Sequence, residues 1–308
     1  MTENQPTYQA VESPSSPSPL IPWGWLRALL FIVVLVIVSL GIGAVTALFF
    51  DIWSAEDEIA AISSSAGILI NAFQLAVLLG VTALMRRFVD RQSVLSLGFS
   101  LKSPYLKDLF AGLLWGFGMI SAIFLILWSI GAIEVTEINF PLTSLLVMIP
   151  SLFFAAAQEE IIVRGYLLNN LMQSFNKYVA LALTGLVFSL AHMFNPSFGA
   201  AALANIIMAG FVLGIYYIHR RNLWFPIGLH LAWNYFQGAI YGSPVSGLTT
   251  PGVMTLEFNP SYDSLTGGTF GFEAGWLTAI LLVIVTVSLH FLYRPKPSRD
   301  IQSIPQSH

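Results

Sequence analysis

The sequence predicts an all-α, polytopic membrane protein with about eight transmembrane helices, a polar site within the membrane and both termini in the cytoplasm. Two compositional observations favour this class. Of the 308 residues, 56% are hydrophobic and only 9% are charged, whereas a soluble domain averages about 25% charged residues. The third observation is a series of long apolar segments, because a helix needs about 20 apolar residues to cross a bilayer core.

The N-terminal segment precedes the first apolar run and contains "ESPSSPSP". Such a composition cannot build a core, so residues 1–22 are predicted to be a disordered cytoplasmic tail. The tail is long and acidic and lacks a small-residue cleavage site, so we do not expect a cleaved signal peptide. The membrane domain is predicted over residues 23–294, and residues 295–308 form a second cytoplasmic tail.

Eight apolar segments are candidate transmembrane helices. In chain order they are Leu26–Phe50, Ala66–Met85, Leu109–Ile133, Phe140–Gln158, Tyr178–Met193, Gly199–Ile218, Leu223–Tyr241 and Ala274–Tyr293. The fourth span is expected to continue past its charged residues to about Met172, with a tilt or a break near Gly165. Gly210 and Gly214 form a small-xxx-small pair that would bring the sixth span close to a neighbour.

Charged residues between the spans predict one orientation, because basic residues concentrate on the cytoplasmic side. The basic flanks include Arg27, Arg86, Arg87, Arg91, Lys102, Lys107, Lys177, Arg220, Arg221, Arg294, Lys296 and Arg299. The acidic flanks include Asp51, Glu56, Asp57, Glu58, Glu134 and Glu137. Both termini are therefore predicted to be cytoplasmic, and the loop Gly242–Glu273 is predicted to face outward.

Two glutamates and an arginine interrupt the apolar run "FFAAAQEEIIVRGYLL". Ionisable groups within a span are costly, so they are functional-site hypotheses. Glu160 and Arg164 are four residues apart on one helix face and favour an ion pair. Glu159 points about 100° away, which leaves it as the freer base. The alternative is that all three form a solvated cytoplasmic flank.

Two further spans contribute polar groups, namely His192 at the end of one and His230 with Asn234 in another. Taken singly, His192 could be interfacial, and His230 with Asn234 could form a packing hydrogen bond. Together with Glu159 they supply a base, a proton relay and hydrogen-bond donors for an oxyanion. Glu159, His192 and His230 are also a candidate zinc set with one position open for water. Metal-bound and metal-free water both remain open.

Other chemistries are excluded by residues that the chain lacks. It has no cysteine, no HExxH motif and no serine in a nucleophile elbow. A net charge of −3 gives no indication of a nucleic-acid partner. Because charged groups at depth need water or protein partners, we expect a water-filled cavity that opens to the cytoplasmic half.

Three motifs carry a resemblance to a known family. They are "EEIIVR" (EExxxR) at Glu159, Glu160 and Arg164, "FSLAH" (FxxxH) at Phe188 and His192, and "HLAWN" (HxxxN) at His230 and Asn234. In this order and on successive helices, they resemble the CPBP group of intramembrane proteases, also called the Abi or CAAX-protease family. The resemblance covers about residues 111–247, the expected peptidase core, in which Asn205 precedes the run "NLWFPIGLHLAWN".

The resemblance implies an intramembrane endopeptidase that cleaves a membrane-associated protein or peptide. The implied roles are water activation by Glu159 and His192, oxyanion stabilisation by His230 and Asn234, and support by Glu160, Arg164 and Asn205. The implied cofactor is either none or one zinc-like divalent ion. We expect a multi-pass protein of the plasma (cytoplasmic) membrane, with membrane lipid and a membrane-associated substrate as its partners.

Two other functions compete with peptidase activity. The first is a non-catalytic membrane scaffold or a bacteriocin-immunity-type protein with the same fold. The second is an ion-coupled transporter, which the absence of inverted repeats in the sequence disfavours. The substitution of Glu159 separates peptidase from scaffold, because only a peptidase would lose activity while it keeps its fold.

Overall fold

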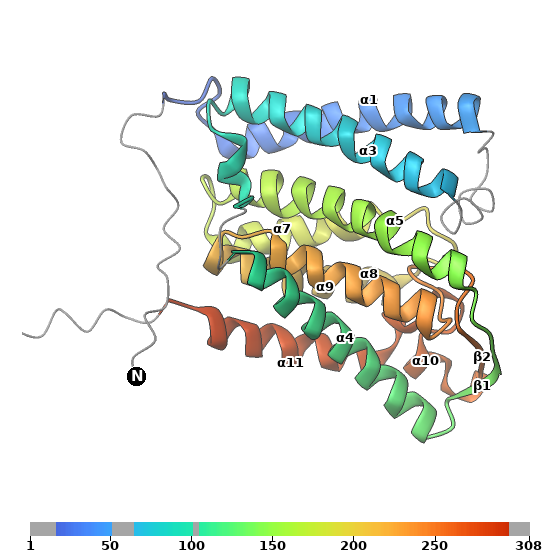
Figure 1. Ribbon diagram of the computed structural model, residues 1–308. Helices are drawn as coiled ribbons and strands as arrows, with labels where there is room; N and C mark the ends of the chain where they lie inside the picture. The colour runs from blue at the N-terminus through green and yellow to red at the C-terminus, as the bar shows by residue number, and fades with distance from the viewer. Residues whose placement is uncertain (1–16, 51–64, 101–104, 296–308) are drawn as a thin grey trace, which may run out of the picture.

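The computed structural model describes residues 17–50, 65–100 and 105–295, and this part of the chain is largely helical. Its eight longer helices lie alongside one another (Figure 1). They are α1 (Gly24–Phe50), α3 (Ser65–Leu84), α4 (Tyr105–Ser129), α5 (Leu142–Glu160), α7 (Lys177–Leu190), α8 (Ala200–Arg220), α9 (Trp224–Asn234) and α11 (Trp276–Tyr293). Each predicted span therefore has a helical counterpart, and the all-α membrane class is confirmed.

Six helices in the described part are long and apolar enough to cross a bilayer. The two others are α7, which has 14 residues, and α9, which has 11 residues and continues as the π-helix η4 (Tyr235–Ile240). Large apolar side chains cover the outer faces of the long helices, as Leu40, Phe49 and Leu114 illustrate with 70–80% exposure. An outer surface of this kind suits contact with lipid acyl chains, so the protein is an integral membrane protein.

The remaining elements are short. They are η1 (Met85–Val89), η2 (Val94–Leu97), η3 (Ile161–Leu168), α6 (Asn169–Leu171), η5 (Pro260–Tyr262), α10 (Asp263–Thr266), η6 (Gly268–Phe270) and η7 (Phe272–Ala274). The segment η3 is a π-helix that joins α5 to α6, and Leu142–Leu171 is a single 30-residue helix. The predicted continuation of the fourth span is thus confirmed, and the irregularity near Gly165 is a π-helical segment, a feature often found at functional sites.

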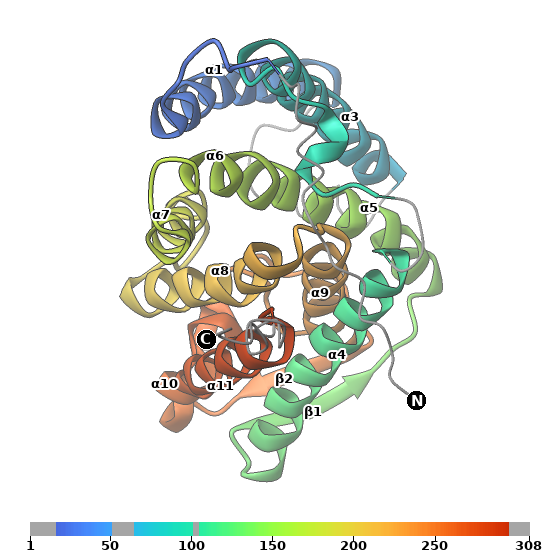
Figure 2. The ribbon, with the colours of Figure 1, turned by 90° about the vertical axis from the view of Figure 1, so that its left-hand side faces the viewer.

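The helices are arranged in layers. Viewed from one end, α1 and α3 lie on one side of α5, while α4 and α11 lie beyond α9 and α8 (Figure 2). The helices α8 and α9 occupy the middle of the bundle, and most residues of both are buried. The side chains of these two helices are therefore shielded from lipid and available to build a polar site.

A small antiparallel sheet, which the sequence did not predict, lies at one end of the bundle (Figure 1). It pairs β1 (Ile133–Ile138) with β2 (Met254–Phe258) in the register Ile133↔Phe258, with an irregularity between Val135 and Glu137. We call this end of the molecule the sheet end, and the opposite end, where α8 finishes in His219 and Arg220, the basic end.

Two arginines that sequence analysis counts as cytoplasmic flanks are buried in a polar network. Asp90 accepts hydrogen bonds from Arg27 Nη1 at 3.0 Å and from Arg86 Nη1 at 2.9 Å. It also accepts from the Tyr166 hydroxyl at 3.1 Å and from Asn170 Nδ2 at 3.2 Å. The network fastens α1 and η1 to the segment that follows the two glutamates.

The glycine pair of the sixth span allows α8 to approach α7 closely. A Cβ atom on Gly210 would lie 2.8 Å from the Cα atom of Gly185, and one on Gly214 would lie 2.3 Å from Leu181 Cδ1. The predicted close approach is therefore confirmed. It places Gly210 beside the residues that follow Glu160.

Some expectations fall outside the described residues. Residues 1–16 of the predicted N-terminal tail and residues 296–308 of the C-terminal tail are among them, as are the charged residues Asp51, Glu56, Asp57, Glu58 and Lys102. The orientation of the termini and the division into tails and membrane domain therefore stay predictions.

Candidate active site

The first part of the site is the predicted ion pair at the end of α5. Arg164 Nη1 lies 2.9 Å from Glu160 Oε1, and both side chains are buried. The guanidinium group also lies 4.4 Å from the centre of the Phe188 ring, in a cation–π geometry. Its Nη2 donates to the Gly210 carbonyl oxygen at 3.4 Å. Arg164 thus connects η3, α7 and α8, and the spacing argument for this pair is confirmed.

His230 adds a second partner to Glu160. Its Nδ1 lies 3.0 Å from Glu160 Oε1, the oxygen that also accepts from Arg164. A carboxylate oxygen accepts hydrogen bonds, so Nδ1 carries the hydrogen and Nε2 faces the remaining space. Helix spacing predicts Arg164 as the partner of Glu160 and leaves Glu159 to meet the histidines. In the structure His230 faces Glu159 and also contacts Glu160, so Glu160 has a second partner that spacing did not predict.

Glu159 has a different environment from that of its neighbour. Its side chain is 34% exposed, and its Oε2 lies 3.8 Å from His230 Nε2. That oxygen is buried yet accepts no hydrogen bond from the described residues. The freer of the two carboxylates therefore points an unpaired oxygen toward the free nitrogen of His230.

His192 lies in the turn after α7, two residues beyond the last helical residue, Leu190. Its Nδ1 donates to the Phe188 carbonyl oxygen at 2.8 Å, which leaves Nε2 unprotonated in the neutral ring. The Phe188 ring packs edge-on against both histidines, with ring centroids 4.9 Å from His192 and 6.1 Å from His230. Phe188, the first residue of the FxxxH motif, thus packs against both histidines and Arg164.

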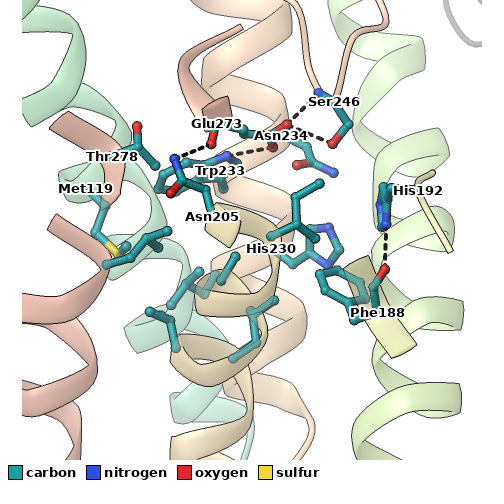
Figure 3. A pocket seen from close by; sticks show the side chains of 16 residues that line it. Met119, Phe188, His192, Asn205, His230, Trp233, Asn234, Ser246, Glu273 and Thr278 are labelled. Carbon is teal, nitrogen blue, oxygen red and sulfur yellow. Dashed lines mark hydrogen bonds between the residues drawn. The ribbon is translucent and has the colours of Figure 1, made fainter. Parts of the chain in front are cut away.

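A cavity joins four of the predicted site residues. His192, Asn205, His230 and Asn234 all line it (Figure 3). The other lining residues are Met119, Phe188, Ile206, Ala209, Val212, Leu213, Leu229, Trp233, Ser246, Glu273, Thr278 and Leu282. The two glutamates of α5 are not part of this lining, so His230 is the residue that links the carboxylates to the cavity.

The cavity also contains functional groups that sequence analysis missed. Glu273 Oε1 accepts from Trp233 Nε1 at 3.1 Å, and Glu273 Oε2 accepts from the backbone N and the Oγ of Ser246 at 2.5 and 2.7 Å. Burial raises the pKa of Glu273, and the hydrogen bonds from Ser246 and the nearby His192 offset this only in part. The sequence signal that could have identified Glu273 is its position as a single acidic residue directly before the last apolar span.

The cavity lies toward the sheet end of the bundle. Ser246 and Glu273 belong to the segment that the charge pattern places outside, and the other lining residues come from the same half or from the middle of helices. The lining includes no residue from the basic end. Because the orientation of the helices in the membrane is itself a prediction, the expected opening toward the cytoplasmic half also stays a prediction.

A zinc site built from Glu159, His192 and His230 does not match this arrangement. Among the described residues, no group of three or more histidine and acidic side chains is arranged to hold a metal ion. Glu159 and His230 face one another at 3.8 Å, but they form no such group together with His192. The residues present therefore do not fit the three-ligand set that a catalytic zinc ion requires.

Comparison with known proteins agrees with the motifs. Residues 141–236 match the family model described as type II CAAX prenyl endopeptidase Rce1-like. The resemblance to the CAAX-protease family is confirmed. The Rce1-like segment contains Glu159, Glu160, Arg164, His192, Asn205, His230 and Asn234. No curated protein and no solved structure matches the chain in the corresponding comparisons.

The Rce1-like segment is not the whole of the site. It ends at residue 236, whereas Ser246 and Glu273 lie beyond it and still line the cavity. The part of the chain that follows the family segment therefore contributes to the wall of the candidate active site.

Proposed function

We propose that this protein is an intramembrane endopeptidase that hydrolyses a peptide bond in a membrane-associated protein or peptide. The observation that carries the proposal is the facing pair of Glu159 Oε2 and His230 Nε2, 3.8 Å apart, within an Rce1-like segment. A carboxylate and an imidazole that converge on one point can share the protons of a bound water.

In the proposed reaction Glu159 is the general base. Its Oε2 takes a proton from the water as the oxygen attacks the scissile carbonyl, and the carboxylic acid then protonates the leaving amine. Glu160 is less suited to this role, because its side chain is fully buried and its Oε1 is paired with Arg164 and His230, although its Oε2 has no hydrogen-bond partner among the described residues. His192 presents Nε2 and is proposed to orient the same water, as its Nδ1 is engaged by Phe188.

The oxyanion is proposed to be stabilised by Asn234 and His230. The side-chain NH₂ of Asn234 is proposed to donate an uncharged hydrogen bond to the oxyanion. A protonated His230 is proposed to donate a second one from Nε2, while Glu160 fixes the orientation of the ring through Nδ1. Fixing the ring before the reaction is useful, because a donor that is already oriented needs no reorganisation as charge develops. Asn205 is proposed to support the site through the turn that carries Glu273.

The proposed setting is the plasma (cytoplasmic) membrane, with lipid around the exposed apolar faces. The proposed mechanism uses no metal ion, because the candidate zinc ligands do not form a three-ligand group among the described residues. A water activated by Glu159 then accounts for every step.

The test is cleavage of a quenched peptide library by the purified protein, with and without a chelator. Wild type should cleave in both conditions, and Glu159→Gln should lose all measurable cleavage while it keeps its helical content. Glu134→Gln is the matched control, because Glu134 is exposed on β1. Normal cleavage by Glu159→Gln would refute the mechanism, and loss of cleavage on chelation would refute its metal-free form.

A further inference from the structure

Glu273 and Ser246 form a junction between segments that are distant in sequence, which we call the Ser246–Glu273 junction. The two oxygens of Glu273 accept three hydrogen bonds, two from Ser246 and one from Trp233 (Figure 3). Trp233 directly precedes Asn234 on α9. The junction therefore ties the loop that follows η4 to the turn of α9 that presents the proposed oxyanion donor.

The junction also reaches the segment that carries His192. Asn195 Nδ2, three residues after His192, donates to the Ser246 carbonyl oxygen at 2.9 Å. The neighbouring Gly247 packs so closely that a Cβ atom there would lie 2.1 Å from the Pro196 carbonyl oxygen. The loop around Ser246 is therefore fixed against the turn that holds His192.

A third attachment comes from α8. Asn205 Nδ2 donates to the backbone carbonyl oxygens of Glu273 and Gly275, at 2.8 and 2.9 Å. These bonds fix the backbone of η7 and hence the direction in which the Glu273 side chain enters the cavity. These two hydrogen bonds are the contacts through which Asn205 would support the site, as the family resemblance implies.

The backbone at the junction forms a tight turn. Ser246 and Gly247 have φ values of 48° and 83°, and Val245 and Leu248 on either side exchange two backbone hydrogen bonds of 2.9 Å. Positive φ at both central residues is what a two-residue type I′ turn requires. The turn presents the backbone N and the Oγ of Ser246 to Glu273 and its carbonyl oxygen to Asn195.

We propose that Glu273 is a positioning residue of the peptidase site, which holds Asn234 and His192 at a fixed separation across the cavity through Trp233 and Ser246. The inference rests on the proposed function. Glu273 is not itself a candidate base, because the hydrogen bonds from Trp233 and Ser246 occupy both of its oxygens. It acts through the residues that it anchors.

Glu273→Gln is the informative substitution. A glutamine presents one acceptor oxygen and one NH₂ donor, so it must lose either the bond from Trp233 or the bond from the Ser246 backbone N, whereas Ser246 Oγ can reverse its role and accept from the NH₂ group. We expect kcat to fall by roughly 100-fold, the order of loss that a 1 Å misplacement causes, with little change in KM. Ser246→Ala removes only the Oγ bond and should give a smaller loss. Glu257→Gln is the matched control, because Glu257 is exposed on β2.

A second measurement reports the geometry without activity. The chain has no cysteine, so spin labels on Phe194→Cys and Thr249→Cys report one distance between the two loops. Both residues are exposed. In Glu273→Gln the distribution of that distance should broaden, and in Glu257→Gln it should not.

The outcomes separate the two proposals. A lower kcat together with a broadened distance supports the positioning role. Wild-type kcat in Glu273→Gln, or an unchanged distance distribution, overturns it. If the wild-type protein cleaves no peptide, the proposed function fails, and the distance measurement still decides whether Glu273 fixes the two loops.

Discussion

Glu160 Oε1 lies 3.0 Å from His230 Nδ1, and the same oxygen lies 2.9 Å from Arg164 Nη1. The orientation of a proposed catalytic imidazole therefore depends on an ion pair that belongs to another helix. We expect Glu160→Ala to reduce both stability and activity, because it frees the His230 ring and leaves Arg164 buried without its carboxylate. The free energy of unfolding should fall by about 3–5 kcal/mol, as for other broken buried pairs. Denaturant titration and peptide cleavage measure the two effects, and a variant that lost only one of them would contradict the coupling.

Glu159 and Arg164 should respond differently to substitution. Glu159→Gln should abolish cleavage and change the free energy of unfolding by less than about 1 kcal/mol, because the side chain is partly exposed and its buried oxygen lacks a partner. Arg164→Ala should first destabilise the fold, because it leaves Glu160 as a buried charge. Thermal unfolding in detergent, measured beside cleavage, separates the two. Identical behaviour of both variants would show that the division between base and support is wrong.

The contact between α7 and α8 should tolerate no added methyl group. In Gly210→Ala the new Cβ would lie 2.8 Å from the Gly185 backbone, so the helices must move apart. Overpacking of this kind costs about 1–3 kcal/mol, and it would also displace the Gly210 carbonyl oxygen that Arg164 contacts. Gly80→Ala is the control, because a Cβ there meets nothing within 4 Å. Equal thermal midpoints for the two variants would count against tight packing.

Asp90 should be essential for attaching α1 to the rest of the bundle. Asp90→Asn removes the carboxylate that pairs with Arg27 and Arg86, so two buried arginines lose their counter-charge. We expect a loss of about 3–5 kcal/mol in the free energy of unfolding, and faster proteolysis in the segment that contains α1. The exposed Asp263→Asn variant should behave like wild type. A stable, protease-resistant Asp90→Asn protein would show that the network adds little.

The pH dependence of stability should contain a contribution from Glu273, which lies outside the membrane-spanning helices. Burial raises its pKa, so ionisation of Glu273 opposes folding at pH values above the raised pKa. This unfavourable contribution disappears as the pH falls from the raised pKa toward the ordinary glutamate value. The thermal midpoint of wild type relative to Glu273→Gln should therefore increase as the pH falls through that window. A difference that does not change with pH would contradict the raised pKa.

Much of the fold follows from patterns that are local in the chain. Apolar segments predicted a helix at each of the eight longer helices of the described residues, because lipid leaves a spanning backbone no alternative to internal hydrogen bonds. The sheet between β1 and β2 was missed, since its strands are more than a hundred residues apart and each is short. The same holds for Asp90, whose partners come from three separate segments.

The candidate site also contains one contact that local spacing predicted and one that only helix packing determined. Spacing within one helix predicted the pair Glu160–Arg164, because residues four apart share a helix face. The contact between Glu160 and His230 could not be predicted in this way, since it depends on how α9 is rotated against α5. Helix spacing predicted Arg164 as the partner of Glu160 and Glu159 as the freer base, and helix packing adds His230 as a second partner of Glu160.

By itself the sequence determined the membrane class, the helical fold and the set of motif residues, because hydropathy and helix periodicity are properties of neighbouring residues. Tertiary structure alone decided that the cavity lies toward the sheet end, that His230 joins the carboxylates to it, and that Ser246 and Glu273 complete its wall. These features depend on contacts between residues far apart in the chain. Such contacts are fixed when the helices pack, and no local pattern records them.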